Sequence, residues 1–458
     1  MSQHFDAVVI GAGQAGPPLA ERLGRAGKRV AVIERNLVGG TCVNTGCIPT
    51  KAMVASAYVA HMTHRAYEYG VLQAEDSRVD MQLVRERTQG ISGRARSGVD
   101  SWLRNMANVT LLEGHARFES ATTLSCGDTL IDADSFFINV GGRASVPAFP
   151  GIDSVPFLTN TGMMELREVP EHLIIVGGSY IGLEFGQMFL RFGSKVTIVE
   201  RSTRLLPRED EDASKAIFSM LQDEGVAVYL GAECIALGGK AGAVKIKAEG
   251  NQLCEKEEGT HLLLAVGRQP NTDDLGLDKA GVAVDAHGYI KVDEYCRSNV
   301  PGIWAIGDCN GRGAFTHTAY NDFEIVAANV LDNDQRRISD RILAYSLFID
   351  PPLARVGLTE QEARQSGREV LVGVRPMSRV GRAVERSETV GFMKVVVDGA
   401  TQELLGAAIF GVGGDEAIHC LLDVMYAKAP YSVVSRAVHI HPTVAEFLPT
   451  TLQSLRVT

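Results

Sequence analysis

Short apolar runs alternate with amphipathic segments in the first part of the chain. Residues 6–10 (DAVVI) and 30–33 (VAVI) are almost wholly apolar, which is typical of strands buried on both faces of a parallel sheet. Between them, residues 17–26 place Leu19 and Leu23 on one face of a helix. This order predicts a strand–helix–strand unit of an α/β fold.

The same order returns later in the chain. Residues 172–176 and 195–199 predict two more buried strands, with a helix over 183–192 between them. Apolar runs at 136–142 and 303–308 predict further strands, each closing on glycine. The chain therefore repeats one kind of α/β unit.

Two helices are predicted between the first unit and the short strands that begin at residue 113. Residues 52–67 have apolar side chains on or near one face. Residues 79–112 are polar and rich in arginine, and we interpret these arginines as a solvated face.

The pattern changes after two consecutive prolines at 351–352. Alternating apolar segments at 369–374, 392–397 and 403–410 predict antiparallel strands, with helical segments around them. Prolines and a glycine near residue 150 break the pattern earlier. We therefore predict four segments, 1–150, 151–270, 271–345 and 346–458.

Charge and composition limit the classes of partner. The chain of 458 residues carries a formal net charge of −10, with a pI near 5.6, which argues against nucleic acid or an anionic membrane surface. It has no apolar run long enough to cross a bilayer and no secretory leader, so we expect a cytoplasmic protein.

The first unit carries a complete dinucleotide fingerprint. Its first strand runs into Gly11, Gly13 and Gly16 at Gly-x-Gly-x-x-Gly spacing, and its second strand ends on Glu34. Glycines let the backbone approach a pyrophosphate, the helix N-terminus attracts it, and the acid accepts hydrogen bonds from a ribose.

The second unit carries a similar turn with one change. Gly177, Ser179 and Gly182 follow its first strand, so that a small serine replaces the middle glycine, and Glu200 ends its second strand. The acid favours NADH, whereas Arg201 and the nearby Arg204 offer charges for the 2′-phosphate of NADPH. We expect NADH and keep NADPH as the alternative.

A close pair of cysteines lies between the first unit and the next helix. Cys42 and Cys47 stand in a glycine-rich loop, and Lys51 follows. A structural zinc site needs a second pair or a Cys/His cluster at ligand spacing, and the sequence shows none, so we expect no metal site. A thiolate at a helix start near a lysine is acidic and reactive, which predicts a redox-active pair.

The run Gly39 to Lys51 resembles the active-site signature of the class I flavoprotein disulfide reductases, Gly-Gly-x-Cys-x4-Cys-x-Pro followed by lysine. This family includes dihydrolipoamide dehydrogenase and mercuric reductase, and the resemblance covers nearly the whole chain. It implies an α/β fold with two Rossmann-like domains, for FAD and NAD(P), a central part that completes the FAD site, and a C-terminal α+β dimerisation domain.

The resemblance also implies roles for single residues beside the flavin. Lys51 and Glu184 match the family's ion pair, Asp308 the residue that holds the ribityl chain, and Tyr180 the residue that covers the flavin. Further expected cofactor contacts are Gly40, Thr41, Gly114, Ala116, Gly141, Gly267, Thr316 and His317.

The last motif is His441-Pro with Glu446 five residues on, and it matches the family's acid/base dyad. The resemblance implies that this dyad reaches the dithiol from the partner subunit, hence a homodimer. Electrons are expected to pass from NAD(P)H through FAD to Cys47, the flavin-side sulfur. Cys42 then attacks the substrate, and histidine suits the proton transfer.

The electron acceptor stays open. The enzyme is expected to reduce a small disulfide or another thiol-reactive acceptor. Alternatives are a dihydrolipoamide dehydrogenase component bound to a lipoyl protein, a reductase of mercuric ion or hypothiocyanous acid, and a diaphorase-like quinone reductase. The sequence ends without the vicinal cysteine pair of mercuric reductases, which argues against mercury.

Overall fold

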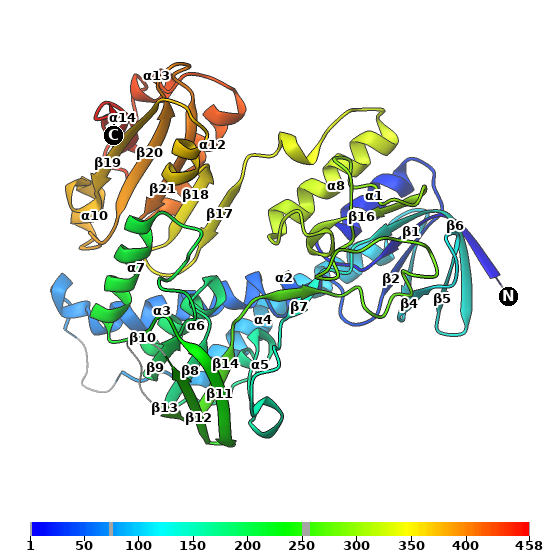
Figure 1. Ribbon diagram of the computed structural model, residues 1–458, viewed down its shortest axis with the longest axis horizontal. Helices are drawn as coiled ribbons and strands as arrows, with labels where there is room; N and C mark the ends of the chain where they lie inside the picture. Colours follow the sequence, from blue (N-terminus) through cyan, green and yellow to red (C-terminus); the bar gives the residue numbers. More distant parts are fainter. Residues whose placement is uncertain (1, 73–76, 250–256, 458) are drawn as a thin grey trace.

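The protein is described by a computed structural model that covers residues 2–72, 77–249 and 257–457. Its strands form three main sheets, which lie in different parts of the molecule and have helices packed beside them (Figure 1). The N-terminal sheet lies on the right of that view, the four-stranded sheet below, and the C-terminal sheet at upper left.

The first sheet has seven strands in the order β3-β2-β1-β6-β5-β4, with β16 paired to β6. β1, β2, β3, β6 and β16 run parallel, and their carboxyl ends meet at one edge. The glycine turn after β1 lies at this edge and opens α1. The bounds are β1 Ser2–Ile10, α1 Gly16–Arg25, β2 Val30–Glu34, β3 Val109–Glu113, β4 Ala116–Phe118, β5 Thr123–Cys126, β6 Thr129–Ile138 and β16 Ile303–Ala305.

The second sheet repeats this arrangement with four parallel strands in the order β10-β9-β8-β14. Its strands are buried because helices and a small antiparallel sheet, β11-β12-β13, cover it. The bounds are β8 His172–Val176, α6 Tyr180–Phe192, β9 Lys195–Val199, α7 Glu211–Glu224, β10 Ala227–Tyr229, β11 Glu233–Lys240, β12 Ala243–Glu249, β13 Glu257–Gly259 and β14 His261–Leu264.

The third sheet is antiparallel, with six strands in the order β17-β18-β21-β20-β19-β22. This confirms the antiparallel strands predicted at 369–374, 392–397 and 403–410, while the first strand of the sheet, β17, precedes the prolines at 351–352. The bounds are β17 Ala344–Leu347, β18 Leu353–Gly357, α9 Glu360–Gln365, β19 Val370–Pro376, α10 Gly381–Glu385, β20 Phe392–Asp398, β21 Leu404–Phe410, α11 Gly414–Ala417, α12 His419–Tyr426, α13 Ser432–Ser435, α14 Leu448–Leu452 and β22 Arg456–Val457.

The remaining elements connect these sheets and carry part of the cavity wall. β7 and β15 form a two-stranded link between the first two regions. α3 crosses the molecule in Figure 1 and packs against both α4 and α6. The bounds are α2 Gly40–Asn44, α3 Cys47–His64, α4 Met81–Arg104, β7 Gly142–Ala144, α5 Asn160–Met163, β15 Arg268–Pro270 and α8 Thr316–Leu331.

Two predicted helix ranges were wrong at their ends. The helix predicted over 79–112 ends at Arg104, because Asn108 takes a left-handed backbone with φ of 63° and the apolar residues after it pair with β2 as β3. The helix predicted over 52–67 begins earlier, at Cys47, so the second cysteine lies in its first turn.

The arginines of α4 are more than a solvated face. Arg87 donates to the carbonyl oxygen of Ala52 at 2.7 Å and so ties α4 to α3, while Arg85 pairs with Glu165 at 2.6 Å.

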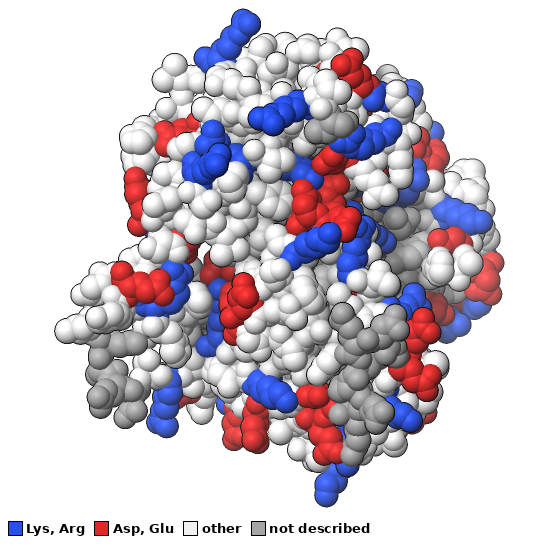
Figure 2. Space-filling model, turned by 60° about the vertical axis from the view of Figure 1, so that its left-hand side comes forward, with Lys and Arg blue, Asp and Glu red and all other residues white. Residues whose placement is uncertain are grey.

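Elsewhere, Lys and Arg lie interspersed with Asp and Glu on the face shown in Figure 2. No helix within the described ranges is long and apolar enough to cross a membrane.

Candidate active site

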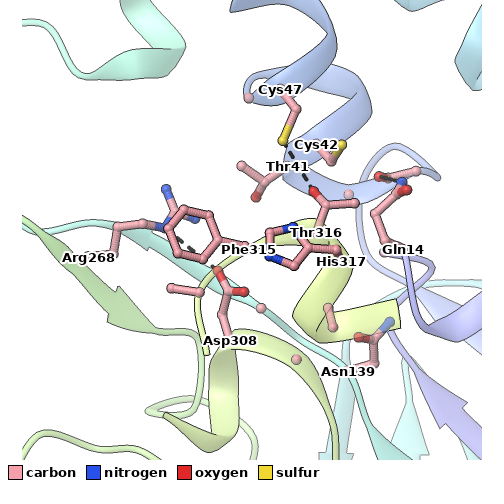
Figure 3. Close-up of a pocket in the computed structure, with 18 of the residues that line it drawn as sticks. Gln14, Thr41, Cys42, Cys47, Asn139, Arg268, Asp308, Phe315, Thr316 and His317 are labelled. Carbon is pink, nitrogen blue, oxygen red and sulfur yellow. Dashed lines mark hydrogen bonds and ion pairs between the residues drawn. The ribbon is translucent and has the colours of Figure 1, made fainter. Parts of the chain in front are cut away.

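A cavity of about 1130 Å³ is lined by residues of the first sheet, α3, α6 and the C-terminal sheet. Figure 3 shows the part of it around the two cysteines and Asp308. One end is formed by the glycine turn after β1, and the other is lined by residues of β17, β18, α11 and α12. The dithiol loop, 39–47, lies along its wall. The cavity is large enough for an extended ligand of dinucleotide size.

The turn after β1 leaves backbone where a side chain would fill the space. Gly11 has φ of +104°, and a Cβ there would lie 2.3 Å from the carbonyl oxygen of Asn139, whose amide donates to the Gly11 carbonyl at 3.0 Å. A Cβ on Gly40 would lie 2.8 Å from the Cα of Gly13. The turn and the dithiol loop thus form one cradle of bare backbone, which fits a pyrophosphate.

Two glutamates are held in the same way at the ends of β2 and β9. Glu34 accepts hydrogen bonds from the backbone N–H of Ala12 at 2.8 Å and of Asn36 at 2.9 Å. Glu200 accepts from the N–H of Gly178 at 2.6 Å and of Ser202 at 2.7 Å. Each carboxylate is therefore fixed beside a glycine turn, where a ribose is expected.

The two cysteines lie on consecutive helices. Cys42 is in the short helix α2, and Cys47 is at the start of the long helix α3. The Cys47 sulfur lies 3.2 Å from Thr316 Oγ1 (Figure 3). The hydrogen bond from Cys42, then Thr316 and the charge of Lys51, lower the pKa of Cys47 to about 6, against the opposing effect of burial. The same hydrogen bond, with burial, raises the pKa of Cys42. In the reduced pair, Cys47 therefore carries the anion and Cys42 the proton.

The dithiol loop is fastened at two points. Asn44 donates through its amide to the carbonyl oxygens of Gly40 at 2.9 Å and Val38 at 3.0 Å. Asn160, which is buried at the start of α5, donates to the carbonyl oxygen of Thr45 at 2.8 Å. The second bond links the loop to the segment that precedes the second nucleotide unit.

Lys51 and Glu184 form a short ion pair inside the cavity. The lysine Nζ lies 2.7 Å from Glu184 Oε2, and the glutamate side chain is only 8% exposed. Glu184 also accepts from the backbone N–H of Phe348 at 2.9 Å, and Lys51 lies over the Phe348 ring. The pair thus joins α3, α6 and the C-terminal region at one point.

A second ion pair lies at the opposite wall of the cavity. Arg268 Nε is 3.8 Å from Asp308 Oδ2, and Figure 3 shows both side chains beside Phe315. Burial raises the pKa of Asp308, and Arg268 opposes this. The Asp308 carboxylate faces the cavity from the turn after β16, where it is placed to accept hydrogen bonds from hydroxyl groups.

Most of the predicted cofactor residues share this cavity. Its wall includes Gly11, Gly13, Glu34, Gly40, Thr41, Lys51, Gly114, Ala116, Gly141, Tyr180, Asp308, Thr316 and His317. Other predicted residues are outside the set that lines it: Gly16, Gly177, Ser179, Gly182, Glu200 and Gly267. The cradle of bare backbone, the fixed Glu34 and the carboxylate of Asp308 fit FAD. When bound, FAD supplies electron transfer between a nicotinamide and the dithiol.

Comparison with protein families matches two models to the chain. Residues 5–322 match the pyridine nucleotide-disulphide oxidoreductase model, and residues 343–452 match the dimerisation domain of the same family.

The chain belongs to this family. It is therefore an FAD-dependent enzyme that takes electrons from NAD(P)H, and the match to a dimerisation domain supports a homodimer.

Several relatives match this oxidoreductase over more than nine-tenths of its chain. The probable pyridine nucleotide-disulfide oxidoreductase RclA of Escherichia coli is 37% identical over 452 residues, 97% of this chain and 98% of that protein. A Staphylococcus aureus mercuric reductase is 34% identical over 91% of this chain and 76% of its own. A Chlamydia muridarum dihydrolipoyl dehydrogenase is 33% identical over 97% and 96%. The solved structure of RclA aligns with a TM-score of 0.89 at 36% identity, covering 98% and 99% of the two chains.

His441 and Glu446 are joined, but away from this oxidoreductase's own dithiol cavity. His441 Nδ1 lies 3.0 Å from Glu446 Oε2, and the histidine side chain is 80% exposed. Neither residue is among the described residues that line the cavity of the same chain. The neighbouring Val438 and Ile440 are 100% and 80% exposed. A histidine presented outward beside apolar side chains is suited to act on another subunit.

Four residues of the site were missed by the sequence analysis. Asn160, Tyr345, Glu209 and Arg355 all contact the site from segments without a glycine or cysteine motif. Glu209 and Asp210 form an acidic pair in sequence, and Arg355 follows much later, three residues after Pro352. Neither segment has a motif that indicates a functional site. Thr316 was expected as a cofactor contact, and the structure adds a hydrogen bond between its hydroxyl and the Cys47 sulfur.

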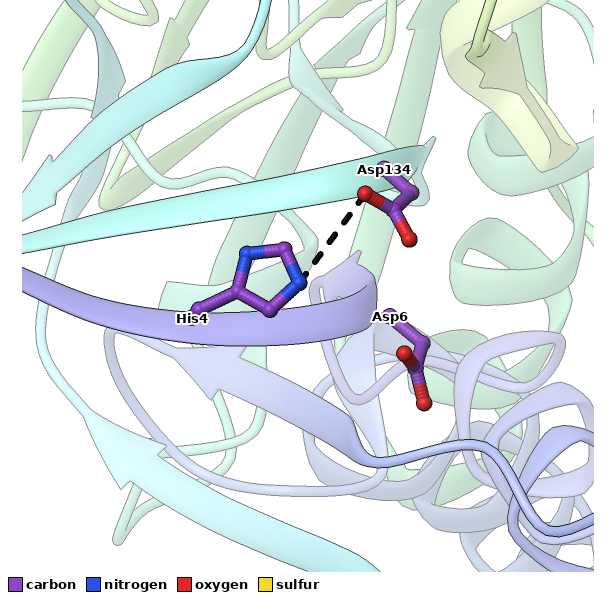
Figure 4. A group of neighbouring side chains, drawn as sticks. All are labelled: His4, Asp6 and Asp134. Carbon is purple, nitrogen blue, oxygen red and sulfur yellow. Dashed lines mark ion pairs between the residues drawn. The ribbon is translucent and has the colours of Figure 1, made fainter.

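One group of side chains has atoms close enough to share a cation. His4, Asp6 and Asp134 lie on the neighbouring strands β1 and β6, with His4 Nε2 3.9 Å from Asp134 Oδ1 (Figure 4). The group lies at the end of β1 remote from the glycine turn, and the His4 and Asp134 side chains are 60% and 67% exposed. It takes no part in the cavity.

Proposed function

We propose that this oxidoreductase uses NADH to reduce a small thiol-reactive oxidant of the hypothiocyanous acid class through Cys42 and Cys47. The observation that carries the proposal is the charge of the cavity wall. Each Arg or Lys among its described residues is already paired with a carboxylate, so no free cation remains to bind an anionic acceptor.

The pairs occur all around the cavity. They are Arg35–Asp274 at 2.9 Å, Lys51–Glu184 at 2.7 Å, Arg268–Asp308 at 3.8 Å, Arg355–Glu209 at 2.6 Å, and Arg341–Asp322. The wall also holds Asp415 and Glu416, which form no ion pair with the residues that the structure describes. Glutathione disulfide is anionic at neutral pH, and binding it here would place like charges together. A small acceptor without a fixed negative charge avoids this cost.

The chemistry needs a base because Cys42 keeps its proton while Cys47 is the anion. His441 of the partner subunit, oriented by Glu446, would accept that proton. The Cys42 sulfur then bonds to the sulfur of hypothiocyanous acid, and the leaving hydroxide takes the proton back as water. Cys47 attacks Cys42, the bond to the thiocyanate group breaks, and thiocyanate leaves with the electron pair. The product is the Cys42–Cys47 disulfide. FAD held by the glycine turn after β1 and by Glu34 would supply the electrons of NADH that return this disulfide to the dithiol.

The relatives support this class of acceptor. The solved RclA is described as an HOCl-induced flavoprotein disulfide reductase, and this chain matches it over nearly its full length. An enzyme induced by a halogen oxidant points to acceptors formed from such oxidants. We also propose that the enzyme works in the cytoplasm, where thiols are kept reduced.

Glu200 supports NADH as the donor. Its carboxylate is fixed by two backbone N–H groups beside the second glycine turn, where a free 2′-hydroxyl would donate to it and a 2′-phosphate would be repelled. Of the two arginines that could instead serve a phosphate, Arg201 and Arg204, the second donates to the Pro207 carbonyl oxygen at 2.7 Å. We therefore expect Glu200→Ala to weaken NADH binding more than NADPH binding.

A second candidate is a dihydrolipoyl dehydrogenase that serves a lipoyl protein. A relative of that name matches 97% of this chain at 33% identity. Lipoamide is uncharged, so the paired cations of the cavity do not exclude it. Copurification with a lipoylated partner would favour this candidate over the oxidant reductase.

The test is a panel of acceptors with the purified holoenzyme. NADH and NADPH are each offered with hypothiocyanous acid, lipoamide, glutathione disulfide, mercuric ion and a quinone. We expect fast NADH-dependent turnover of hypothiocyanous acid that is lost in Cys42→Ser and retained in Cys234→Ser, an exposed cysteine outside the cavity. Faster turnover of lipoamide or glutathione disulfide would contradict the proposal, as would oxidant turnover that survives Cys42→Ser.

A further inference from the structure

We propose that Tyr345 and Glu209 position Tyr180 and thereby set how tightly the enzyme binds its nicotinamide nucleotide. The inference rests on the proposed function, in which NADH binds at the second glycine turn beside Glu200. Tyr180 is the first residue of α6, directly after Ser179 of the second glycine turn, and Glu184 lies one helical turn further in. A nicotinamide that reaches the cavity from that turn must pass the Tyr180 ring.

The Tyr180 ring is held in the cavity by aromatic neighbours and one hydroxyl contact. Its edge meets Phe315 at 6.2 Å and Tyr345 at 5.6 Å between ring centroids. Its hydroxyl donates to Glu209 Oε1 at 3.4 Å, a long hydrogen bond. Burial, then the charge of Glu209, raises the pKa of Tyr180 to about 12, so the phenol stays a donor at neutral pH.

Glu209 cannot move with Tyr180, because its carboxylate accepts two shorter hydrogen bonds from other residues. Its Oε1 accepts from the Tyr345 hydroxyl at 2.6 Å, and its Oε2 accepts from Arg355 Nε at 2.6 Å. Glu209 is 2% exposed and Arg355 is 1% exposed, and the arginine also donates to Asp210 at 3.0 Å. The carboxylate is therefore a fixed point between the second α/β unit and the C-terminal sheet.

The sheet itself brings both donors to this carboxylate. Tyr345 on β17 and Arg355 on β18 are directly opposite partners in an antiparallel pair. Cross-strand partners have neighbouring side chains on one face, so one register delivers a hydroxyl and a guanidinium to the same group. A shift of one residue in this pairing would separate them.

Tyr180 and Tyr345 share one acceptor oxygen, Glu209 Oε1, and Tyr345 has the shorter bond to it, which decides the cost of moving Tyr180. When Tyr180 swings away, Glu209 retains its bonds to Tyr345 and Arg355, so no buried charge is left unpaired. Without the Tyr345 hydroxyl, Tyr180 would be the remaining hydroxyl donor to Oε1. The hydrogen bond from Tyr180 to Glu209 would shorten, and moving the Tyr180 ring would then leave Glu209 Oε1 without a hydroxyl donor. The Tyr345 hydroxyl thus keeps the entrance easy to open.

The prediction is that Tyr345→Phe weakens nucleotide binding. We expect the dissociation constant of NAD⁺, which binds without reacting, to rise about three- to tenfold, because the change strengthens an existing long hydrogen bond and does not add a whole one. In a Tyr180→Phe background the same change should have no effect, because the competing hydroxyl is gone. Glu209 stays intact in every variant, so no charge is stranded beside Arg355.

The experiment is calorimetric titration of the holoenzyme with NAD⁺. The variants are Tyr345→Phe, Tyr180→Phe, the double variant, Tyr180→Ala and, as a control, Tyr67→Phe on an exposed surface. Weaker binding in Tyr345→Phe alone supports the proposal. Unchanged binding in Tyr345→Phe, or the same loss in the Tyr180→Phe background, overturns it. If Tyr180→Ala also leaves the affinity unchanged, the entry beside Tyr180 is itself wrong, and that failure is separate from the reduction of the oxidant.

Discussion

Replacing Thr316 by valine removes a hydrogen bond that stabilises the Cys47 thiolate. The Thr316 hydroxyl lies 3.2 Å from the Cys47 sulfur, and valine keeps nearly the same shape without a donor. The other groups that hold the pKa of Cys47 near 6 are Cys42 and Lys51, and both stay in place. The change therefore isolates one contribution to the acidity of the flavin-side sulfur.

The expected size follows from the strength of such bonds. A hydrogen bond to a charged group contributes about 1.5–3 kcal/mol, and one pKa unit corresponds to about 1.4 kcal/mol. Since Cys47 is exposed, solvent compensates part of the loss, and we expect a rise of about one unit. The pKa of Cys47 then lies near 7, so its thiolate fraction at pH 7 falls from about nine-tenths to about one half.

The assay is alkylation of the reduced protein with iodoacetamide between pH 5 and 9, read on the Cys47 peptide by mass spectrometry. Only the thiolate reacts, so the rate follows its titration. Thr63→Val, on the exposed part of α3, is the matched control and should leave the Cys47 profile unchanged. An unchanged profile in Thr316→Val would refute the reasoning and leave the acidity to Cys42, Lys51 and the helix start.

Three further predictions concern the dithiol loop and the dyad. Cys42→Ser should abolish reduction of the acceptor yet leave reduction of the flavin by NADH intact, which stopped-flow absorbance separates. Asn160→Ala leaves the half-buried Thr45 carbonyl oxygen without its donor, so we expect about 1 kcal/mol of lost stability and faster hydrogen exchange confined to the loop. Equal mixing of inactive Cys42→Ser and His441→Gln subunits should restore about one quarter of the wild-type activity. Half of the dimers would then be hybrids with one intact site, and no recovery would contradict a dyad that acts across the interface.

The strands and glycine turns were predictable because their signals are local. Residues 172–176 and 195–199 form strands over the predicted ranges, since apolar runs of this length have few other solutions in an α/β fold. The end of α4 was not predictable in this way. The turn near Asn108 contains no glycine or proline, and the short strand after it continues the polar helix without a break in pattern.

The site was predictable only where a motif carried it. Cys42 and Cys47 lie five residues apart, and each glycine turn is a run of six residues, so each motif is local in sequence. The family pattern supplied Lys51 and its partner. Glu209 and Arg355 lie far apart in the chain and meet only because two sheets pack together. Such a pair depends on tertiary packing, and neither residue differs locally from a surface charge.

The central claim is that Cys42 and Cys47 together reduce a thiol-reactive oxidant. The most direct measurement mixes the NADH-reduced enzyme, freed of excess NADH, with one equivalent of hypothiocyanous acid and identifies the cysteine products by mass spectrometry. We predict loss of two thiols per oxidant and a disulfide-linked peptide that joins Cys42 to Cys47. Consumption of the oxidant with both cysteines still free would contradict the account.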